Sequence, residues 1–170
     1  SLLMPNALQQ DSGLIRAKLL GGDVSYKLSA VYVEFENVAS PGDPVTPPVS
    51  VPDSEGIDYY QGLSGSVSRD FMRVPISFPP LIDTDDELYD LPNRWTVVVD
   101  VPAGTGYHGK PFNSGSNSTV FGLALVATPD WDDELEDLVY SRQYYEVVDQ
   151  SPVPPSGVLR LTFAQTFPTE

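Results

Sequence analysis

The chain of 170 residues is long enough for one domain, which would bury roughly 70% of the surface that the unfolded chain exposes. Its 24 acidic and 9 basic residues give a net charge of -15, and this field disfavours nucleic acid and anionic membranes as partners. The lack of cysteine excludes disulfide bonds, thiolate zinc sites and cysteine nucleophiles.

The N-terminal segment has the one helical pattern of the chain, and we expect a helix over residues 6–22. Asn6 or Asp11 can supply an N-cap oxygen, and Gly21-Gly22 provides a stop. The mainly apolar face of this helix comprises Leu14, Ile15, Lys18 and Leu19. Because the helix is short, it must be stabilised by packing against the rest of the domain.

Residues 28–37, "LSAVYVEFEN", change to a period of two, which is typical of a strand. One face carries Val31, Val33 and Phe35, and the other carries Tyr32, Glu34 and Glu36. The pattern predicts a strand that is buried on one face.

A proline-rich arm or long loop follows over residues 39–56, where five prolines lack the backbone donor that a sheet or helix interior needs. An arm already extended by proline loses less entropy on docking than a glycine-rich linker, so it could contact a partner. The candidate contact residues are Pro41, Pro44, Val45, Pro47, Pro48, Val49, Val51 and Pro52. The alternative is an arm folded back on its own domain.

Further strands are expected at 69–78, 94–101, 119–127, 138–148 and 158–167. In 94–101 the alternation places Trp95, Val97, Val99 and Val101 on one side. Proline- and glycine-rich connections between the strands, with almost no helix, favour antiparallel pairing. We therefore expect a mainly β chain with a single domain over 1–170, an antiparallel β-sandwich or jelly-roll with one short N-terminal helix.

The stretch "VPAGTGYHGKPFNS" at 101–114 contains Gly-x-Gly-x-x-Gly and Gly-x-x-x-x-Gly-Lys, the patterns of two phosphate-binding loops. Both loops require a helix directly afterwards, and the second requires Ser or Thr after the lysine. Pro111 follows Lys110 and leads into a flexible polar run, so neither requirement is met. We interpret the stretch as a glycine-rich connection between two strands.

His108 is the sole histidine, and Asp100 and several serines could be imagined beside it as a catalytic set. The Gly-x-Ser-x-Gly elbow of a hydrolase is not found in the sequence, and we assign no catalytic residue, no cofactor and no enzymatic activity. A small hydrolase centred on His108 is kept as a further hypothesis, besides the two functions given below.

Acidic residues cluster at 83–90 and 130–137, a composition that calcium prefers. Neither cluster has the glycine and glutamate of an EF-hand, so calcium binding is left open and no metal ligand is assigned. Aromatic residues could form a sugar-stacking platform or an assembly surface, although half of them are expected in the core: Tyr32, Tyr59, Tyr60, Tyr89, Trp95, Tyr107, Trp131, Tyr144 and Tyr145. Those that are exposed support an alternative function as a carbohydrate-binding or adhesion module, assisted by calcium.

The segments "LQQDSGLIRAKLLGG", "YKLSAVYVEFEN" and "LRLTFAQTF" together resemble virion structural proteins of tailed bacteriophages. The resemblance implies a capsid decoration or cement protein, or a tail-fibre or baseplate component. Such a protein is β-rich and noncatalytic, is assembled in the host cytoplasm into the virion, and contacts copies of itself and other virion proteins. We therefore expect a homo-oligomeric assembly protein that binds neither nucleic acid nor membrane.

Overall fold

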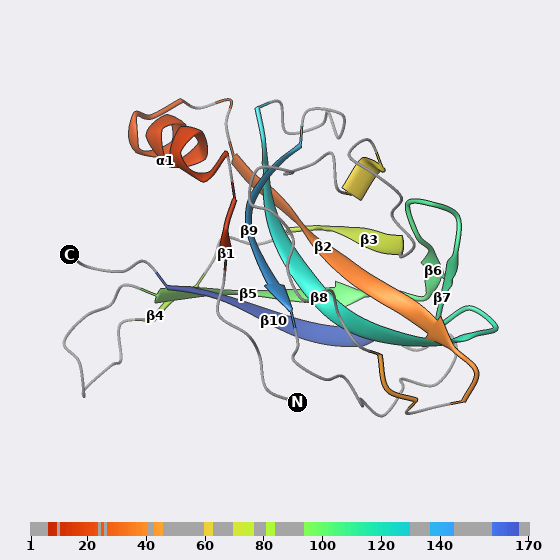
Figure 1. Cartoon of the computed structure of the whole chain (residues 1–170). Coiled ribbons are helices and arrows are strands. Elements are labelled where there is room, and N and C mark those ends of the chain that lie inside the picture. The colour runs from red at the N-terminus through yellow and green to blue at the C-terminus, as the bar shows by residue number, and fades with distance from the viewer. Residues whose placement is uncertain are drawn as a thin grey trace.

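The chain is mainly β and carries one short helix in the part that the computed structural model describes (Figure 1). The described residues are 7–9, 11–23, 25, 27–40, 43–45, 60–62, 70–76, 81–83, 94–129, 137–144 and 158–166. The helix is α1, Ser12–Leu20, and the strands are β1 Ala7–Leu8, β2 Lys27–Val38, β3 Asp70–Pro75, β4 Leu81–Asp83, β5 Arg94–Val101, β6 Gly104–Thr105, β7 Pro111–Phe112, β8 Asn117–Thr128, β9 Leu138–Tyr144 and β10 Leu159–Thr166. Each of the six predicted strand ranges overlaps an observed strand, with β2 and β8 extending beyond their predicted bounds, whereas the short β1, β4, β6 and β7 have no counterpart among the predictions.

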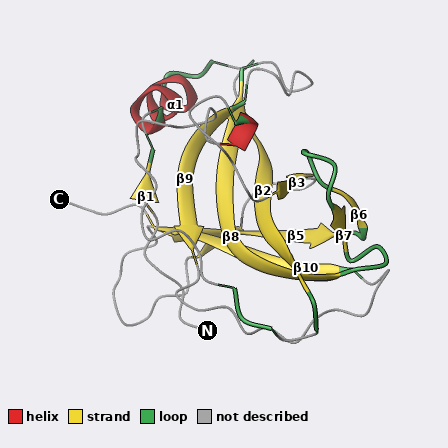
Figure 2. Ribbon diagram, turned by 45° about the vertical axis from the view of Figure 1, so that its right-hand side comes forward, coloured by secondary structure: helices red, strands yellow, loops and turns green. Residues whose placement is uncertain are grey.

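The strands form two antiparallel sheets and a small hairpin. The larger sheet has the order β1-β9-β8-β2-β3, the smaller has the order β10-β5-β4, and β6 pairs with β7. The two sheets lie as separate layers whose strands cross (Figures 1 and 2). One hydrophobic core receives side chains from both layers, among them Val31, Val33, Val97, Val99, Leu123, Leu125, Leu161 and Phe163. This is the predicted antiparallel sandwich.

The smaller sheet follows the predicted alternation. Val97, Val99 and Val101 of β5 are buried, while Val98 between them is 48% exposed. On the neighbouring β10, Leu161 and Phe163 are buried and Thr162 is exposed. One face of this sheet therefore covers the core, as a period of two requires.

β2 departs from its prediction, because it is buried on both faces rather than on one. Tyr32 is 2% exposed and Glu34 is 3% exposed, although both point away from the main core. They lie on the outer face of the larger sheet, where a second apolar cluster collects Ala30, Tyr32, Tyr60, Phe71, Ala124, Val126 and Val139. Tyr60, from the short turn 60–62, packs on this face and its hydroxyl donates a hydrogen bond to Glu34 Oε2 at 3.3 Å.

The predicted helix over residues 6–22 is too long. Ala7 and Leu8 instead form β1, which pairs antiparallel with Arg142 and Ser141 of β9. Asp11 occupies the N-cap position without a side-chain capping bond, and Gly22 adopts a positive φ of 78° after the last turn. The predicted apolar face is also wrong in part, since Ile15 is buried but Leu14 is 49% exposed and Leu19 is 37% exposed.

Candidate functional site

The glycine-rich stretch is a hairpin built on β6 and β7. The amide of Gly106 donates to the Lys110 carbonyl at 2.8 Å, and the amide of Gly109 donates to the Gly106 carbonyl at 3.0 Å. Gly109 has a φ of 90°, a conformation that favours glycine. The chain continues into β7, so the interpretation as a connection between strands is confirmed and the helix of a phosphate-binding loop does not follow.

The hairpin encloses a buried carboxylate, that of Asp70 at the start of β3, which is 1% exposed. Its Oδ1 accepts hydrogen bonds from the amides of His108 at 2.6 Å and Phe71 at 2.7 Å, and its Oδ2 accepts from the amide of Lys110 at 2.9 Å. Gly106 must be glycine, because a Cβ there would lie 2.5 Å from Asp70 Oδ2. The loop amides thus bind an anion, and that anion belongs to the protein.

Beside this carboxylate, three aromatic rings stack from the sheet to the surface. Tyr32 stacks on Phe71 at 4.5 Å, and Phe71 stacks on Tyr107 at 4.8 Å with an angle of 15° between the ring planes. Tyr107 ends the stack and is 48% exposed. Its ring is held on one side by Phe71, which makes it a rigid aromatic surface.

The His108 ring packs edge-to-face against the outer ring of this stack, that of Tyr107. Its ring stands at 79° to that of Tyr107, with 5.1 Å between centroids. Its Nε2 lies 2.6 Å from the Tyr60 carbonyl oxygen, and a carbonyl only accepts, so Nε2 carries the proton and donates. The Nε2 atom is therefore committed to a structural bond.

Asp100, the acid imagined as a partner for His108, pairs instead with Arg160. The guanidinium donates from Nε to Oδ1 at 2.8 Å and from Nη2 to Oδ2 at 3.1 Å, across the exposed face of β5 and β10. The hydrogen bonds from Arg160 hold the pKa of Asp100 below its usual value. A Ser-His-Asp arrangement with Asp100 is not assembled here.

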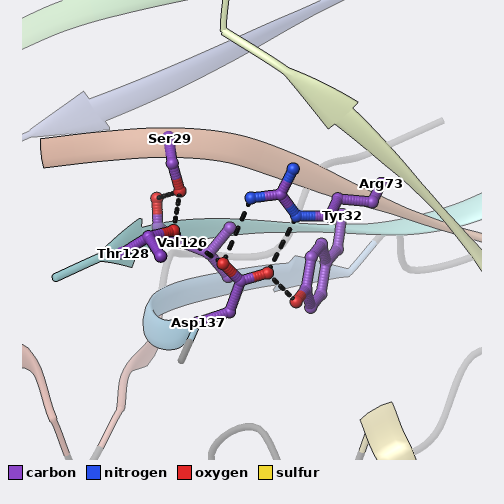
Figure 3. Close-up of polar contacts among 6 residues, drawn as sticks. All are labelled: Ser29, Tyr32, Arg73, Val126, Thr128 and Asp137. Carbon is purple, nitrogen blue, oxygen red and sulfur yellow. Dashed lines mark hydrogen bonds and ion pairs between the residues drawn. The ribbon is translucent and has the colours of Figure 1, made fainter. Parts of the chain in front are cut away.

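A second buried carboxylate, Asp137, joins three strands of the larger sheet just before β9 (Figure 3). Arg73 donates to it from Nε at 2.9 Å and from Nη2 at 3.2 Å, the Tyr32 hydroxyl donates to Oδ2, and Thr128 Oγ1 donates to Oδ1 at 2.6 Å. Ser29 extends the network through a 2.5 Å bond with Thr128. Each carboxylate oxygen accepts two bonds, which fills its lone pairs.

This network changes the ionisation of Tyr32. Burial raises the pKa of the Tyr32 hydroxyl far above its ordinary value, and the negative charge of Asp137 raises it further. The hydroxyl therefore stays protonated and donates to Asp137. The arrangement is a clamp between strands, since side chains of β2, β3 and β8 all donate to the buried carboxylate of Asp137.

Comparison with known proteins identified no relative: no protein-family model, curated protein or solved structure matches this chain. The function therefore has to be argued from this chain alone.

The predicted partner-contact arm is described only at its start. Val45 is 3% exposed and packs with Phe121 and Tyr144 on its own domain, whereas Pro44 is exposed. Val45 thus takes the alternative, folded-back position. The other candidate residues lie outside the described part of the chain, namely Pro41, Pro47, Pro48, Val49, Val51 and Pro52.

The acidic clusters are also described only in part. Of 83–90 the backbone of Asp83 is described at the end of β4, and of 130–137 only Asp137 is described. Across the described ranges, His, Asp and Glu side chains nowhere gather in threes that could hold a metal ion. In the same ranges, α1 is too short to cross a membrane, and no other helix reaches such a length.

Three of the tyrosines considered for ligand stacking are core residues. Tyr32, Tyr60 and Tyr144 are 2%, 1% and 8% exposed, so they serve packing. Tyr107 is the one described tyrosine with an exposed ring. Asp70, which organises the loop, was not singled out by the sequence, although an acidic residue at the boundary of an apolar strand was an available signal. Asp137 belongs to the predicted acidic cluster 130–137, but the structure uses it as a tie within the sheet.

Proposed function

We propose that this chain is a noncatalytic structural protein of a tailed-phage particle, which binds neighbouring capsid or tail subunits. The observation that carries the noncatalytic part of the proposal is that Asp70, His108 and Asp137, three reactive groups in the described part of the chain, serve as internal ties; the phage setting is proposed from the sequence resemblance. Asp70 accepts three backbone hydrogen bonds and Asp137 accepts four from side chains, and His108 donates its Nε2 proton to a backbone carbonyl. Side chains used in this way hold a shape and are not free to transfer protons to a substrate.

The surface of the domain supports the same proposal. Apolar side chains are exposed on α1, where Leu20 is 87% exposed, and on the outer face of the small sheet, where Val98 is 48% exposed. Leu14, Leu19 and Leu20 are exposed together on α1, and such a group of apolar side chains suits contact with a neighbouring subunit. Val45 of the proline-rich segment packs on Phe121 and Tyr144 of its own domain; a partner contact by the other proline-rich residues is proposed from the sequence alone.

Mass spectrometry of purified particles tests this proposal, using the phage whose genome encodes the chain. We expect the chain in the particles at a fixed ratio to the major capsid or tail subunit. Its absence from intact particles, while it accumulates in the infected cell, would contradict the proposal.

A second candidate function, glycan adhesion, is favoured by one observation, the rigid and exposed ring of Tyr107. A sugar ring could stack on its open side, since aromatic rings offer an apolar face with a polar rim. A glycan array with the wild-type chain, Tyr107→Phe and Tyr107→Ala tests this function. Binding that survives in Tyr107→Phe and is lost in Tyr107→Ala supports adhesion, and an array without signal rejects it.

A further inference from the structure

The strand β10 forms one edge of the smaller sheet, whose order is β10-β5-β4 (Figures 1 and 2). It has eight residues, and all of them pair with β5 in one continuous antiparallel register. In such a pair every second residue bonds to the neighbouring strand, and the residues between them direct their N–H and C=O groups the other way. Within the part of the chain that the structure describes, no strand and no backbone hydrogen bond meets these outward groups. β10 is therefore a template on which a further strand can pair.

The other edges of the two sheets are short or protected. β1 and β4 have two and three residues, which is too few to hold a partner strand. β3 contains Arg73 and Pro75, and its Phe71 carbonyl already accepts a hydrogen bond from the Tyr107 amide at 2.8 Å. Short length, charge, proline and bulges are the usual means by which proteins block pairing at an edge. β10, with the sequence "LRLTFAQT", has neither proline nor lysine, and its register with β5 has no bulge.

The surface beside β10 is neutral, although the chain has 24 acidic and 9 basic residues. β10 has no acidic residue, and the charge of its Arg160 is paired with Asp100 of β5, at 2.8 Å from Nε to Oδ1. Next to this pair Thr162 is exposed and Val98 is 48% exposed, and Val158, just before β10, is 58% exposed. A surface of this kind can be covered without burying an unpaired charge.

We propose that β10 pairs antiparallel with β10 of a second copy of this chain, so that the two smaller sheets become one sheet across a twofold axis. This inference rests on the proposed assembly function and names one partner. A second copy presents the same unprotected edge, so each outward N–H meets an outward C=O of its equivalent. The faces of the two sheets match when the axis passes beside a residue such as Thr162 or Phe163. Arg160 then lies opposite Ala164 or Thr166 and not opposite its own equivalent.

The net charge of -15 opposes any contact between two copies, and it sets the salt dependence of the proposed dimer. The contact contains no ion pair between copies, so salt has no attraction to screen there and reduces only the overall repulsion. Dimerisation should therefore strengthen as salt rises from about 20 mM to about 300 mM. Weaker association at higher salt would mean a contact between opposite charges and would overturn the inference.

Sedimentation velocity of the full chain over a range of concentrations measures dimerisation at each salt concentration. Two variants, Thr162→Lys and Thr162→Glu, place a charge near its equivalent at the twofold axis while they shift the net charge in opposite directions. Both should weaken the dimerisation constant at least about tenfold, because like charges approach each other in either case. Thr162 is exposed, so the fold should persist, as circular dichroism and urea midpoints will check.

Val98→Lys and Val98→Glu are the matched controls. Val98 lies opposite Thr162 on β5 and is exposed on the same face, one strand further from the edge. In the dimer the two introduced charges would be about 14 Å apart, across three strand spacings, which exceeds the Debye length at about 0.15 M salt. At that salt concentration these controls should change dimerisation by less than about twofold.

Hydrogen exchange of the unchanged chain gives a second readout. Every second amide of β10 should gain protection as the concentration rises through the dimerisation range, while the amides between them, which already bond to β5, change little. Outward amides that are equally protected in the monomer would mean that the chain covers this edge itself, and that result overturns the inference. A wild-type chain that stays monomeric up to about 1 mM, or Thr162 variants that dimerise like the wild type, would overturn it as well.

Failure of this inference is distinguishable from failure of the proposed function. A chain that is monomeric in solution but present in purified particles rejects pairing through β10 and retains the assembly function. A chain that dimerises through β10 but is missing from particles rejects the assembly function and retains the pairing.

Discussion

Replacement of Asp70 by asparagine tests whether the buried carboxylate holds the hairpin. The substitution preserves the size of the side chain, removes its charge, and turns one acceptor oxygen into an NH2 donor. The carboxylate accepts backbone bonds of 2.6, 2.7 and 2.9 Å from His108, Phe71 and Lys110. If the asparagine oxygen keeps the first two donors, its NH2 group faces the amide of Lys110 and that bond is lost.

The size of the effect follows from these three bonds. A hydrogen bond to a charged group contributes about 1.5–3 kcal/mol and one to a neutral group about 0.5–1.5 kcal/mol, so two weakened bonds cost about 2 kcal/mol. Loss of the bond from the Lys110 amide adds about 1–3 kcal/mol. Asparagine is cheaper to bury than a carboxylate, which offsets part of the loss. We expect Asp70→Asn to lower the free energy of unfolding by about 2–4 kcal/mol.

Urea denaturation followed by tryptophan fluorescence measures this change, and hydrogen exchange locates it. The amides of His108 and Lys110 should lose protection in Asp70→Asn, while amides of β8 keep theirs relative to global unfolding. Asp100→Asn is the matched control, because Asp100 is an exposed carboxylate paired with Arg160 at the surface. It should leave the urea midpoint nearly unchanged.

The reasoning would be refuted if Asp70→Asn and Asp100→Asn shifted the midpoint equally, with the loop amides still protected. That result would mean that the backbone bonds of the hairpin hold it without the carboxylate.

Two further predictions concern stability. Gly122→Ala should destabilise the fold by about 3 kcal/mol, because the new Cβ would lie 2.6 Å from the ring of Tyr144. Gly13→Ala should stabilise it by about 0.5–1 kcal/mol, because the new Cβ has no neighbour within 4 Å. The urea midpoint should fall for the first variant and rise for the second, and a midpoint that does not move in its stated direction contradicts the prediction for that variant. Stability should fall above about pH 10, by up to about 1.4 kcal/mol per pH unit for Tyr32, because burial raises its pKa in the folded chain and only the unfolded chain ionises there. Tyr32→Phe should flatten this alkaline slope in melts between about pH 9 and 11, and an unchanged slope would assign it to other groups.

Long strands with strict alternation could be predicted from the sequence. β5 is an example: Val97 and Val99 face the core, and the predicted bounds coincide with those observed, Arg94–Val101. Short strands could not be predicted, because two or three residues carry no periodicity. β1 was hidden in a helical pattern, and its pairing with β9, more than 130 residues away, overrides the local preference of Ala7 and Leu8.

The burial of polar side chains such as Glu34 and Asp70 could not be predicted from the sequence. Glu34 reads as a solvent-facing residue by alternation, yet it is 3% exposed and accepts a bond from Tyr60. Its cover comes from a turn 26 residues later in the chain, which no local pattern reveals. Asp70 shows the same difficulty, since its donors lie in a loop 38 to 40 residues away.

The hairpin around Asp70 has a consequence for any dissolved anion. Phosphate would have to displace a competitor that is attached to the same chain and has already lost its freedom to diffuse away. The anion-binding amides of this loop are already occupied by a side chain of the same protein, and Gly106 leaves room for the Asp70 carboxylate to approach the loop backbone. A carboxylate at the start of the adjoining strand is the feature to seek when a glycine signature lacks its helix.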